Sequence, residues 1–273
     1  LASSAASDVY KRQGPAGAAL GTTLSQTISV IVSLWVILKK QTGISVKRAD
    51  FRPERVTMGQ VLKIGVPIAA QDGFIQVAFI IITIIANRRG LSAAAAVGIV
   101  EKIISFLFLV PSSMLSTVSA LGAQNMGAGK YDRADQILRY AMGSAVGFGL
   151  CVSLLIQVIA GLVVGLFTTD AAVILLGAQY IRGYIWDCIF AGVHFSFSGY
   201  FCAYGRSEIS FIHNLIAILC VRIPGVYLTS KIFPDTLFPM GLATATGSLL
   251  SVIICTIAFG WLKRQEKRKI KSA

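Results

Sequence analysis

The chain has 273 residues, of which 55% are hydrophobic and 14% are charged, and its formal net charge is +13. A soluble domain carries about a quarter charged residues, so this composition excludes an ordinary soluble protein and favours a membrane protein. The basic residues lie mostly between or after the apolar runs, as in membrane-flanking loops, which argues against nucleic acid as a partner. The two histidines and five cysteines show no metal-ligand spacing, so we expect no metal and no cofactor.

Residues 1–13, LASSAASDVYKRQ, differ from the rest of the chain and lack the apolar stretch of a signal peptide. We interpret them as a non-native or disordered leader, such as a cloning or sequencing scar in front of a truncated gene. They are therefore left out of the fold prediction.

Apolar runs long enough to cross a bilayer follow one another along the remaining sequence. A hydrocarbon core of about 30 Å requires about 20 apolar residues in a helix. Seven runs meet this length, at about 15–38, 61–86, 92–120, 140–167, 173–203, 208–232 and 238–262. They predict an all-α fold, a polytopic membrane helix bundle with about seven transmembrane helices.

The basic residues predict the orientation of these spans, because cytoplasmic loops carry an excess of Lys and Arg. One side would receive Lys39, Lys40, Lys47, Arg48, Arg52, Arg55, Lys130, Arg133, Arg139, Arg206, Lys263, Arg264, Lys267, Arg268, Lys269 and Lys271. The opposite side would receive only Arg88, Arg89 and Lys231. We therefore expect a multi-pass protein of the cell membrane whose C-terminus is cytoplasmic.

The 61–86 run combines a proline with a polar cluster. Pro67 removes one backbone hydrogen bond and predicts a helix kink, and Pro111 and Pro224 should bend their helices similarly. The cluster that follows Pro67 consists of Gln71, Asp72 and Gln76, and its last two members share one helical face. An ionisable group in the middle of a membrane helix usually faces a bundle interior or a wet cavity.

Two later runs add acidic residues near their middles. Glu101 and Lys102 stand side by side in one run, and Asp187 stands in another. Together with Asp72, these carboxyl groups would share one level of the membrane, and Arg222 is close to that level. Because a carboxyl group buried there can exchange a proton near neutral pH, we predict that the three acids form a proton or cation coupling site.

A structural role is the alternative for these acids, which Lys102 or Arg222 could neutralise without any further function. His194 lies two helical turns after Asp187 on the same face, although a histidine in a membrane helix is more often a hydrogen-bonded packing residue. The residues that we assign to the wall of a substrate cavity are Gln71, Gln76, Lys102, His194 and Arg222.

The stretch LGAQNMGAGKYDRA separates two apolar runs at residues 121–134. Asn125 and the glycines would end one helix, and Asp132 would cap the next. In the following run, the pairs Gly143/Gly147 and Gly161/Gly165 form GxxxG patterns, which predict the close approach of a neighbouring helix.

This stretch carries a family resemblance. Its pattern, with Gln124, Asn125, Gly127, Gly129 and Arg133, resembles the loop after the second helix of each half in the multidrug and toxic compound extrusion (MATE) transporters. LKIGVPIAAQD at 62–72 is similar to the start of the family's seventh helix, and VRIPGVYL at 221–228 is similar to its eleventh. The resemblance covers residues 14–273.

The resemblance implies a domain organisation. Residues 14–38 would be the last helix of the N-terminal half, 39–60 the cytoplasmic linker, 61–262 the six-helix C-terminal half, and 263–273 a basic cytoplasmic tail. The protein would be a secondary active antiporter, not an enzyme, that exports small organic and often cationic drugs through the lipid bilayer in exchange for Na⁺ or H⁺. Its partner would be the missing N-terminal half of the same protein.

The sequence departs from the family at the coupling site. Family members with a cation site in this half place a Glu on the seventh helix, eight residues after its proline, and an Asp on the tenth. The matching positions here are Ile75 and Phe190, and Asp72 and Asp187 each stand three residues earlier, about one helical turn.

Two other functions remain open at this point. A flippase of the same superfamily would move a lipid-linked saccharide and would favour a basic cavity for phosphates, which the three acids oppose. A membrane-embedded enzyme would need paired carboxylates in close approach, and the sequence has no GxSxG or metal motif.

Overall fold

The computed structural model describes residues 14–39 and 54–272, and every secondary-structure element in these ranges is a helix. The chain divides into two compact units, Leu1–Arg55 and Val56–Ala273. The first unit contains α2 (Gly14–Lys39), an apolar helix of 26 residues at the predicted 15–38 run. The predicted leader and most of the predicted linker lie outside the described residues.

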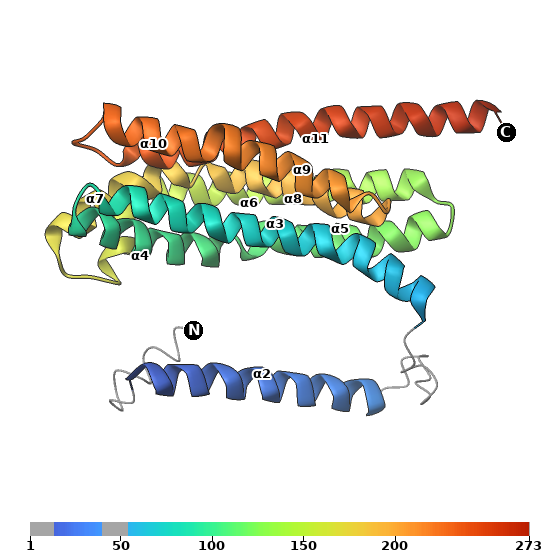
Figure 1. The fold of residues 1–273 in the computed structure, drawn as a ribbon, viewed down its shortest axis with the longest axis horizontal. Helices are drawn as coiled ribbons and strands as arrows, with labels where there is room; N and C mark the ends of the chain where they lie inside the picture. Colours follow the sequence, from blue (N-terminus) through green and yellow to red (C-terminus); the bar gives the residue numbers. More distant parts are fainter. Residues whose placement is uncertain (1–13, 40–53, 273) are drawn as a thin grey trace. The chain divides into compact units, whose positions relative to one another are not determined.

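The second unit contains a helix or a series of helices for each predicted run from 61 to 262 (Figure 1). Three runs are continuous, namely α3 (Arg55–Asn87), α6 (Tyr131–Gly165) and α11 (Phe238–Ser272). The other three are divided. The first consists of α4 (Leu91–Leu107) and α5 (Leu109–Gly127), and the second of α7 (Ala171–Tyr184) and α8 (Asp187–Ala203). The third consists of α9 (Ser207–Ala217), the π-helical turn η2 (Ile218–Arg222) and α10 (Ile223–Ile232).

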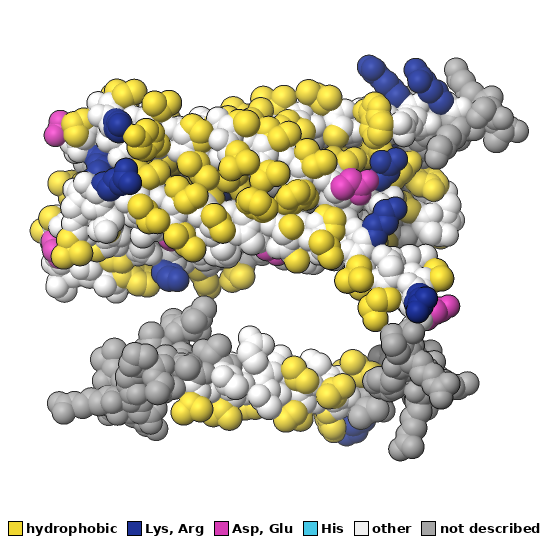
Figure 2. Space-filling model, viewed as in Figure 1, with side chains coloured by type: hydrophobic (Ala, Val, Ile, Leu, Met, Phe, Trp, Pro, Cys, Tyr) yellow, Lys and Arg dark blue, Asp and Glu magenta, His cyan; other side chains and the backbone are white. Residues whose placement is uncertain are grey.

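Five helical stretches of the described residues are long and apolar enough to cross a membrane, namely Arg55–Asn87, Leu91–Gly127, Tyr131–Gly165, Ser207–Ile232 and Phe238–Gln265. Figure 2 shows hydrophobic side chains over the middle of the second unit, with Lys and Arg toward its ends. Helices suit hydrocarbon because they pair their backbone polar groups internally. The protein is a polytopic helical membrane bundle, as the sequence predicts.

Prolines explain two of the three divided runs. The ring of a proline clashes with the carbonyl four residues earlier and its nitrogen has no hydrogen to donate. The interruption between α4 and α5 falls at Phe108, three residues before Pro111. The turn η2 ends two residues before Pro224, and the backbone N–H of Ile223 donates to the Ile218 carbonyl five residues earlier.

Pro67, in contrast, lies inside the continuous helix α3, whose first turns lead away from the line of the rest (Figure 1). The carbonyl that it deprives of a helical partner belongs to Lys63. Ser207 at the start of α9 donates its hydroxyl to this carbonyl at 3.2 Å. A side chain from a neighbouring helix thus satisfies the group that the proline leaves unpaired.

The interruption between α7 and α8 involves no proline. Two side chains of α6 donate to carbonyls at the end of α7: Gln157 Nε2 to Arg182 at 2.9 Å and Ser153 Oγ to Ile185 at 3.1 Å. These bonds satisfy carbonyls at the point where the α-helix stops at Tyr184. The next helix then begins with Asp187.

Glycines let the helices of the second unit approach closely, but at positions other than the two predicted GxxxG pairs. A Cβ on Gly183 of α7 would lie 2.3 Å from the Phe238 carbonyl of α11, and a Cβ on Gly241 of α11 would lie 2.3 Å from the Tyr180 carbonyl. Among the described residues, a Cβ on Gly143, Gly147 or Gly161 would meet nothing within 4 Å, and one on Gly165 would lie 3.8 Å from Ile174 Cδ1. The GxxxG prediction is therefore not confirmed by the described residues, where Gly143 and Gly147 lie on the exposed side of α6.

The loop motif connects α5 to α6. Gly129 has a φ of 73°, which explains the glycine there, and the Asn125 side chain donates to the Leu121 carbonyl at 2.8 Å. Gln124 and Arg133 are exposed, and Gly127 is the last residue of α5. Asp132 was predicted as a cap, yet α6 begins at Tyr131, so Asp132 lies inside its first turn.

Candidate functional site

Asp187 and Arg222 form an ion pair inside the second unit. The Arg222 Nη2 atom donates to Asp187 Oδ2 at 2.9 Å and to the Tyr184 hydroxyl at 3.0 Å. Asp187 is 0% exposed and Arg222 is 7% exposed. The guanidinium also lies over the Phe79 ring, 5.5 Å from its centroid. Hydrogen bonds and an aromatic face thus partly offset the cost of burying these two charges.

Helix interruptions position both members of the pair. Asp187 is the first residue of α8, where the helix dipole favours a negative charge, and Arg222 is the last residue of η2. Gly247 of α11 allows η2 to approach, since a Cβ there would lie 3.0 Å from the Cβ of Arg222. π-helical turns and interrupted membrane helices are both frequent at functional sites.

The ion pair lies on a cavity of about 130 Å³. Its lining residues are Ile75, Phe79, Ile104, Ser105, Phe108, Asp187, His194, Phe195, Asn214, Arg222 and Ser248. The Asp187 carboxylate interacts with the Ser248 hydroxyl of the same cavity. Arg222 Nε is buried and has no hydrogen-bond partner in the described part of the chain. Such an atom calls for water or a ligand, and a cavity of this volume holds a few small molecules of that kind.

A second group of buried polar residues connects α8 to α9. Ser198 Oγ lies 3.0 Å from His213 Nε2, and the rings of His213 and His194 are 5.8 Å apart. The Nδ1 atom of each histidine has no partner among the described residues. Ser210 of α9 donates to Gln71 Oε1 at 2.7 Å. Polar side chains therefore extend from the cavity along α9 to α3.

Glu101 is half-buried in α4, one helical turn before the cavity residues Ile104 and Ser105. The Thr83 hydroxyl of α3 lies 3.4 Å from each Glu101 carboxylate oxygen. Glu101 also interacts electrostatically with Arg222. This second acid is thus close to the ion pair without lining its cavity.

The remaining predicted site residues lie elsewhere. Lys102 is exposed, and so are Asp72 and Gln76 on α3. The position that matches the family's glutamate, Ile75, does line the cavity. Gln71 and Ile75 are four residues apart on the inward face of α3, and Asp72 and Gln76 occupy the neighbouring face because each residue turns the helix by about 100°. The structure therefore does not bring Asp72 to Asp187.

Sequence reasoning missed several residues of the site. Tyr184 was not assigned to the site, although its hydroxyl accepts a hydrogen bond from Arg222. It did not consider Ser210, Asn214 or Ser248. The signal that was available is the spacing of Ser210, His213 and Asn214, which places three polar side chains on one face of a membrane helix.

The sequence of this chain is similar to a known family and to known proteins. The sequence model of the MatE family matches residues 67–228, more than half of the chain. The multidrug export protein MepA of Staphylococcus aureus (strain NCTC 8325 / PS 47) is 26% identical over 219 residues, 80% of this chain and 48% of that protein. The probable multidrug resistance protein YoeA of Bacillus subtilis is 24% identical, over 96% of this chain and 58% of that protein. The chain thus spans about half the length of the curated relatives that it matches.

Solved structures share the fold. An outward-facing multidrug resistance MATE family transporter of the MOP superfamily aligns with a TM-score of 0.82 and 19% identity, over 93% of this chain and 57% of that one. A MOP superfamily transporter from Pyrococcus furiosus aligns with a TM-score of 0.80 and 19% identity, over 91% of this chain and 56% of that one.

Proposed function

Because the chain belongs to the MatE family, we propose that it is one half of a secondary active transporter that exports small organic compounds, drugs among them, across the membrane. Its curated relatives include a multidrug export protein and a probable multidrug resistance protein, and it matches about half of each. We infer that a further half completes the transport path and that this chain alone does not transport. Robust efflux from vesicles that contain only these 273 residues would contradict this inference.

The coupling site that we propose is the Asp187–Arg222 pair. The carrying observation is that this ion pair is buried and lines a cavity, and that Arg222 Nε has no hydrogen-bond partner among the described residues. A proton on Asp187 would remove the negative charge that holds Arg222. The guanidinium would then be attracted to Glu101, with which it already interacts. Because Arg222 ends η2 and Asp187 begins α8, this exchange of partners would shift two interrupted helices.

We favour H⁺ over Na⁺ as the coupling ion. A hard cation such as Na⁺ is bound by several oxygen ligands. Among the described residues that line the cavity, Asp187 is the one carboxylate, and one of its oxygens is bonded to Arg222. A proton needs a single acceptor, and membrane transporters commonly pass protons along Asp, Glu and His side chains.

The substrate path that we propose follows the exposed face of α3. Asp72 and Gln76 lie on this face and are open to contact in the second unit. A carboxylate there favours an organic cation as the transported compound. This assignment rests on the inference that a further half covers α3.

The decisive experiment is dye efflux from vesicles that contain the protein made from the complete gene. A pH gradient without Na⁺ should drive export of a cationic dye, and Asp187→Asn should lower the initial rate more than tenfold. Glu101→Gln and Asp72→Asn should lower it less. Asp132→Asn is the matched control, since it removes an exposed carboxylate at the start of α6 and should transport normally.

Three outcomes would count against parts of this proposal. Wild-type rates in all three site variants would refute the assignment of the acids. Efflux that follows a Na⁺ gradient alone would refute H⁺ coupling. Flipping of a lipid-linked saccharide without dye export would refute the drug substrate.

A further inference from the structure

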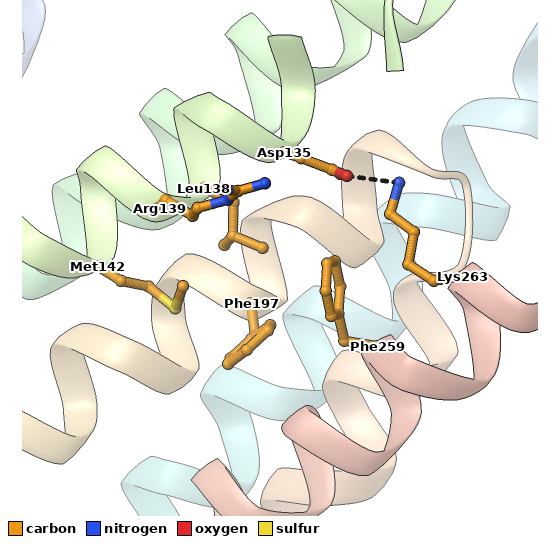
Figure 3. Close-up of a pocket in the computed structure, with 7 residues that line it drawn as sticks. All are labelled: Asp135, Leu138, Arg139, Met142, Phe197, Phe259 and Lys263. Carbon is orange, nitrogen blue, oxygen red and sulfur yellow. Dashed lines mark ion pairs between the residues drawn. The ribbon is translucent and has the colours of Figure 1, made fainter. Parts of the chain in front are cut away.

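A second pocket, separate from the coupling site, lies between α6, α8 and α11 (Figure 3). Its volume is about 260 Å³, and its lining residues are Asp135, Leu138, Arg139, Met142, Phe197, Phe259 and Lys263. Pockets for drug-sized ligands have volumes of about 300–1,000 Å³, so this one would enclose part of a ligand rather than a whole one. Nothing in the transport mechanism above uses it.

The pocket has a polar end and an apolar end. Figure 3 shows the charged atoms of Asp135, Arg139 and Lys263 gathered at one end, with the Met142 and Phe197 side chains toward the other. Such a division matches an amphipathic ligand, whose head would meet the charges and whose hydrocarbon would meet the apolar side chains.

At the polar end of the pocket, the Arg139 guanidinium is available to bind an anionic ligand. Lys263 Nζ lies 2.8 Å from Asp135 Oδ2, and the Tyr200 hydroxyl donates to Asp135 Oδ1 at 2.8 Å. Both carboxylate oxygens are thus occupied. Arg139 has no hydrogen bond or ion pair among the residues that the structure describes, and it is exposed. Two cations against one engaged carboxylate give the pocket a net positive charge.

Neighbouring side chains place the pocket at the level of lipid headgroups. Tyr140, next to Arg139, is 77% exposed, and Trp261, two residues before Lys263, is 46% exposed. Exposed tyrosine and tryptophan are enriched at membrane–water interfaces. Toward the middle of the same two helices the exposed side chains are aliphatic, for example Leu150 on α6 and Ile253 on α11.

We propose that this pocket binds an anionic phospholipid from the surrounding membrane. The lipid phosphate would bond to Arg139 beside the Lys263 ammonium, and an acyl chain would lie along Met142 and Phe259. Basic pockets between membrane helices bind anionic headgroups in this way. The site joins three helices, so a bound lipid would hold α6 against α11 at this membrane surface.

The test is native mass spectrometry of the purified chain with phosphatidylglycerol or phosphatidylethanolamine of identical acyl chains. The chain should retain phosphatidylglycerol in preference. Arg139→Gln should weaken this binding about fivefold, as expected for one basic residue at an anionic membrane surface. Arg133→Gln is the matched control, because it removes the same charge from an exposed position of the same helix, outside the pocket, and should leave binding unchanged.

A second variant tests the pocket itself. Met142→Trp fills the apolar end without changing any charge and should also weaken phosphatidylglycerol binding. Circular dichroism should show unchanged helix content in all three variants. Equal retention of the two lipids, preference for phosphatidylethanolamine, equal effects of Arg133→Gln and Arg139→Gln, or unchanged binding by Met142→Trp would each overturn the proposal.

Discussion

At the scale of single residues, two ion pairs of the second unit differ in burial. Arg222 and Asp187 are buried and 2.9 Å apart, whereas Arg206 and Glu208 are exposed and 3.5 Å apart. Removing one partner of a buried pair leaves an uncompensated charge and costs about 3–5 kcal/mol. An exposed pair contributes about 0–1 kcal/mol because water and salt screen it. The burial of an ion pair, not its charge, therefore decides how much the pair contributes to the stability of the fold.

We accordingly expect Arg222→Gln to lower the melting temperature of the chain in detergent far more than Arg206→Gln does. The first change leaves the Asp187 carboxyl buried without its cationic partner, and the second leaves Glu208 in contact with water. Fluorescence-detected thermal unfolding measures both. Adding Asp187→Asn to Arg222→Gln should recover part of the loss, and no recovery would show that the Asp187 charge is not the cause.

At the scale of elements, close backbone contact at glycines holds α7 against α11. Gly183 and Gly241 lie opposite each other's helix, and a Cβ on either would come within 2.3 Å of a carbonyl oxygen. Small residues are the usual means by which membrane helices approach this closely. The interruption between α7 and α8 depends in turn on side chains of α6 that bond to the carbonyls of Arg182 and Ile185.

Gly183→Ala should therefore destabilise the bundle by about 1–3 kcal/mol, since the backbones must move apart to admit a methyl group. Gly143→Ala is the control on an open helix face, where a Cβ meets nothing within 4 Å and where alanine favours the helix by about 0.5–1 kcal/mol. The two melting temperatures should shift in opposite directions. A matching shift in both would refute the packing argument.

Gln157→Leu should destabilise the chain by about 1–3 kcal/mol, because it leaves the Arg182 carbonyl without its side-chain donor. Gln136→Leu makes the same substitution at an exposed position of the same helix and should cost less. Thermal unfolding of the two variants in one detergent compares them directly. An equal loss would mean that the carbonyl finds another donor, and the explanation of the interruption would fail.

At the scale of the whole molecule, charge sets the orientation that we expect in the membrane. Described basic residues such as Arg139, Arg206, Lys263 and Arg264 belong to one predicted side, and Arg88, Arg89 and Lys231 belong to the other. Several contributors to the first side, such as Lys47 and Arg48, lie outside the described residues. Cytoplasmic loops collect Lys and Arg, which predicts a cytoplasmic C-terminus.

Reporter fusions test this orientation. A green fluorescent protein fused after Ala273 should fluoresce, and alkaline phosphatase at the same position should be inactive. The same reporters inserted after Arg89, in the loop between α3 and α4, should give the reverse result. Active phosphatase at the C-terminus would contradict the charge argument.

The sequence by itself determined the class of fold and the family. The length and apolarity of the runs require helices in hydrocarbon, and the Gln124-to-Arg133 motif with Pro67 and Pro224 is readable without coordinates. It also singled out Asp187 and Arg222, because charged residues in the middle of membrane helices are rare.

The tertiary structure alone decided which of these groups meet. The rotation of α3 directs Ile75 to the cavity and leaves Asp72 exposed, the interruption at Ile185 places Asp187 at the start of a helix, and Arg222 reaches it from η2. Sequence fixes the depth of a side chain through helix rise, but the direction in which it points depends on how neighbouring helices rotate and pack.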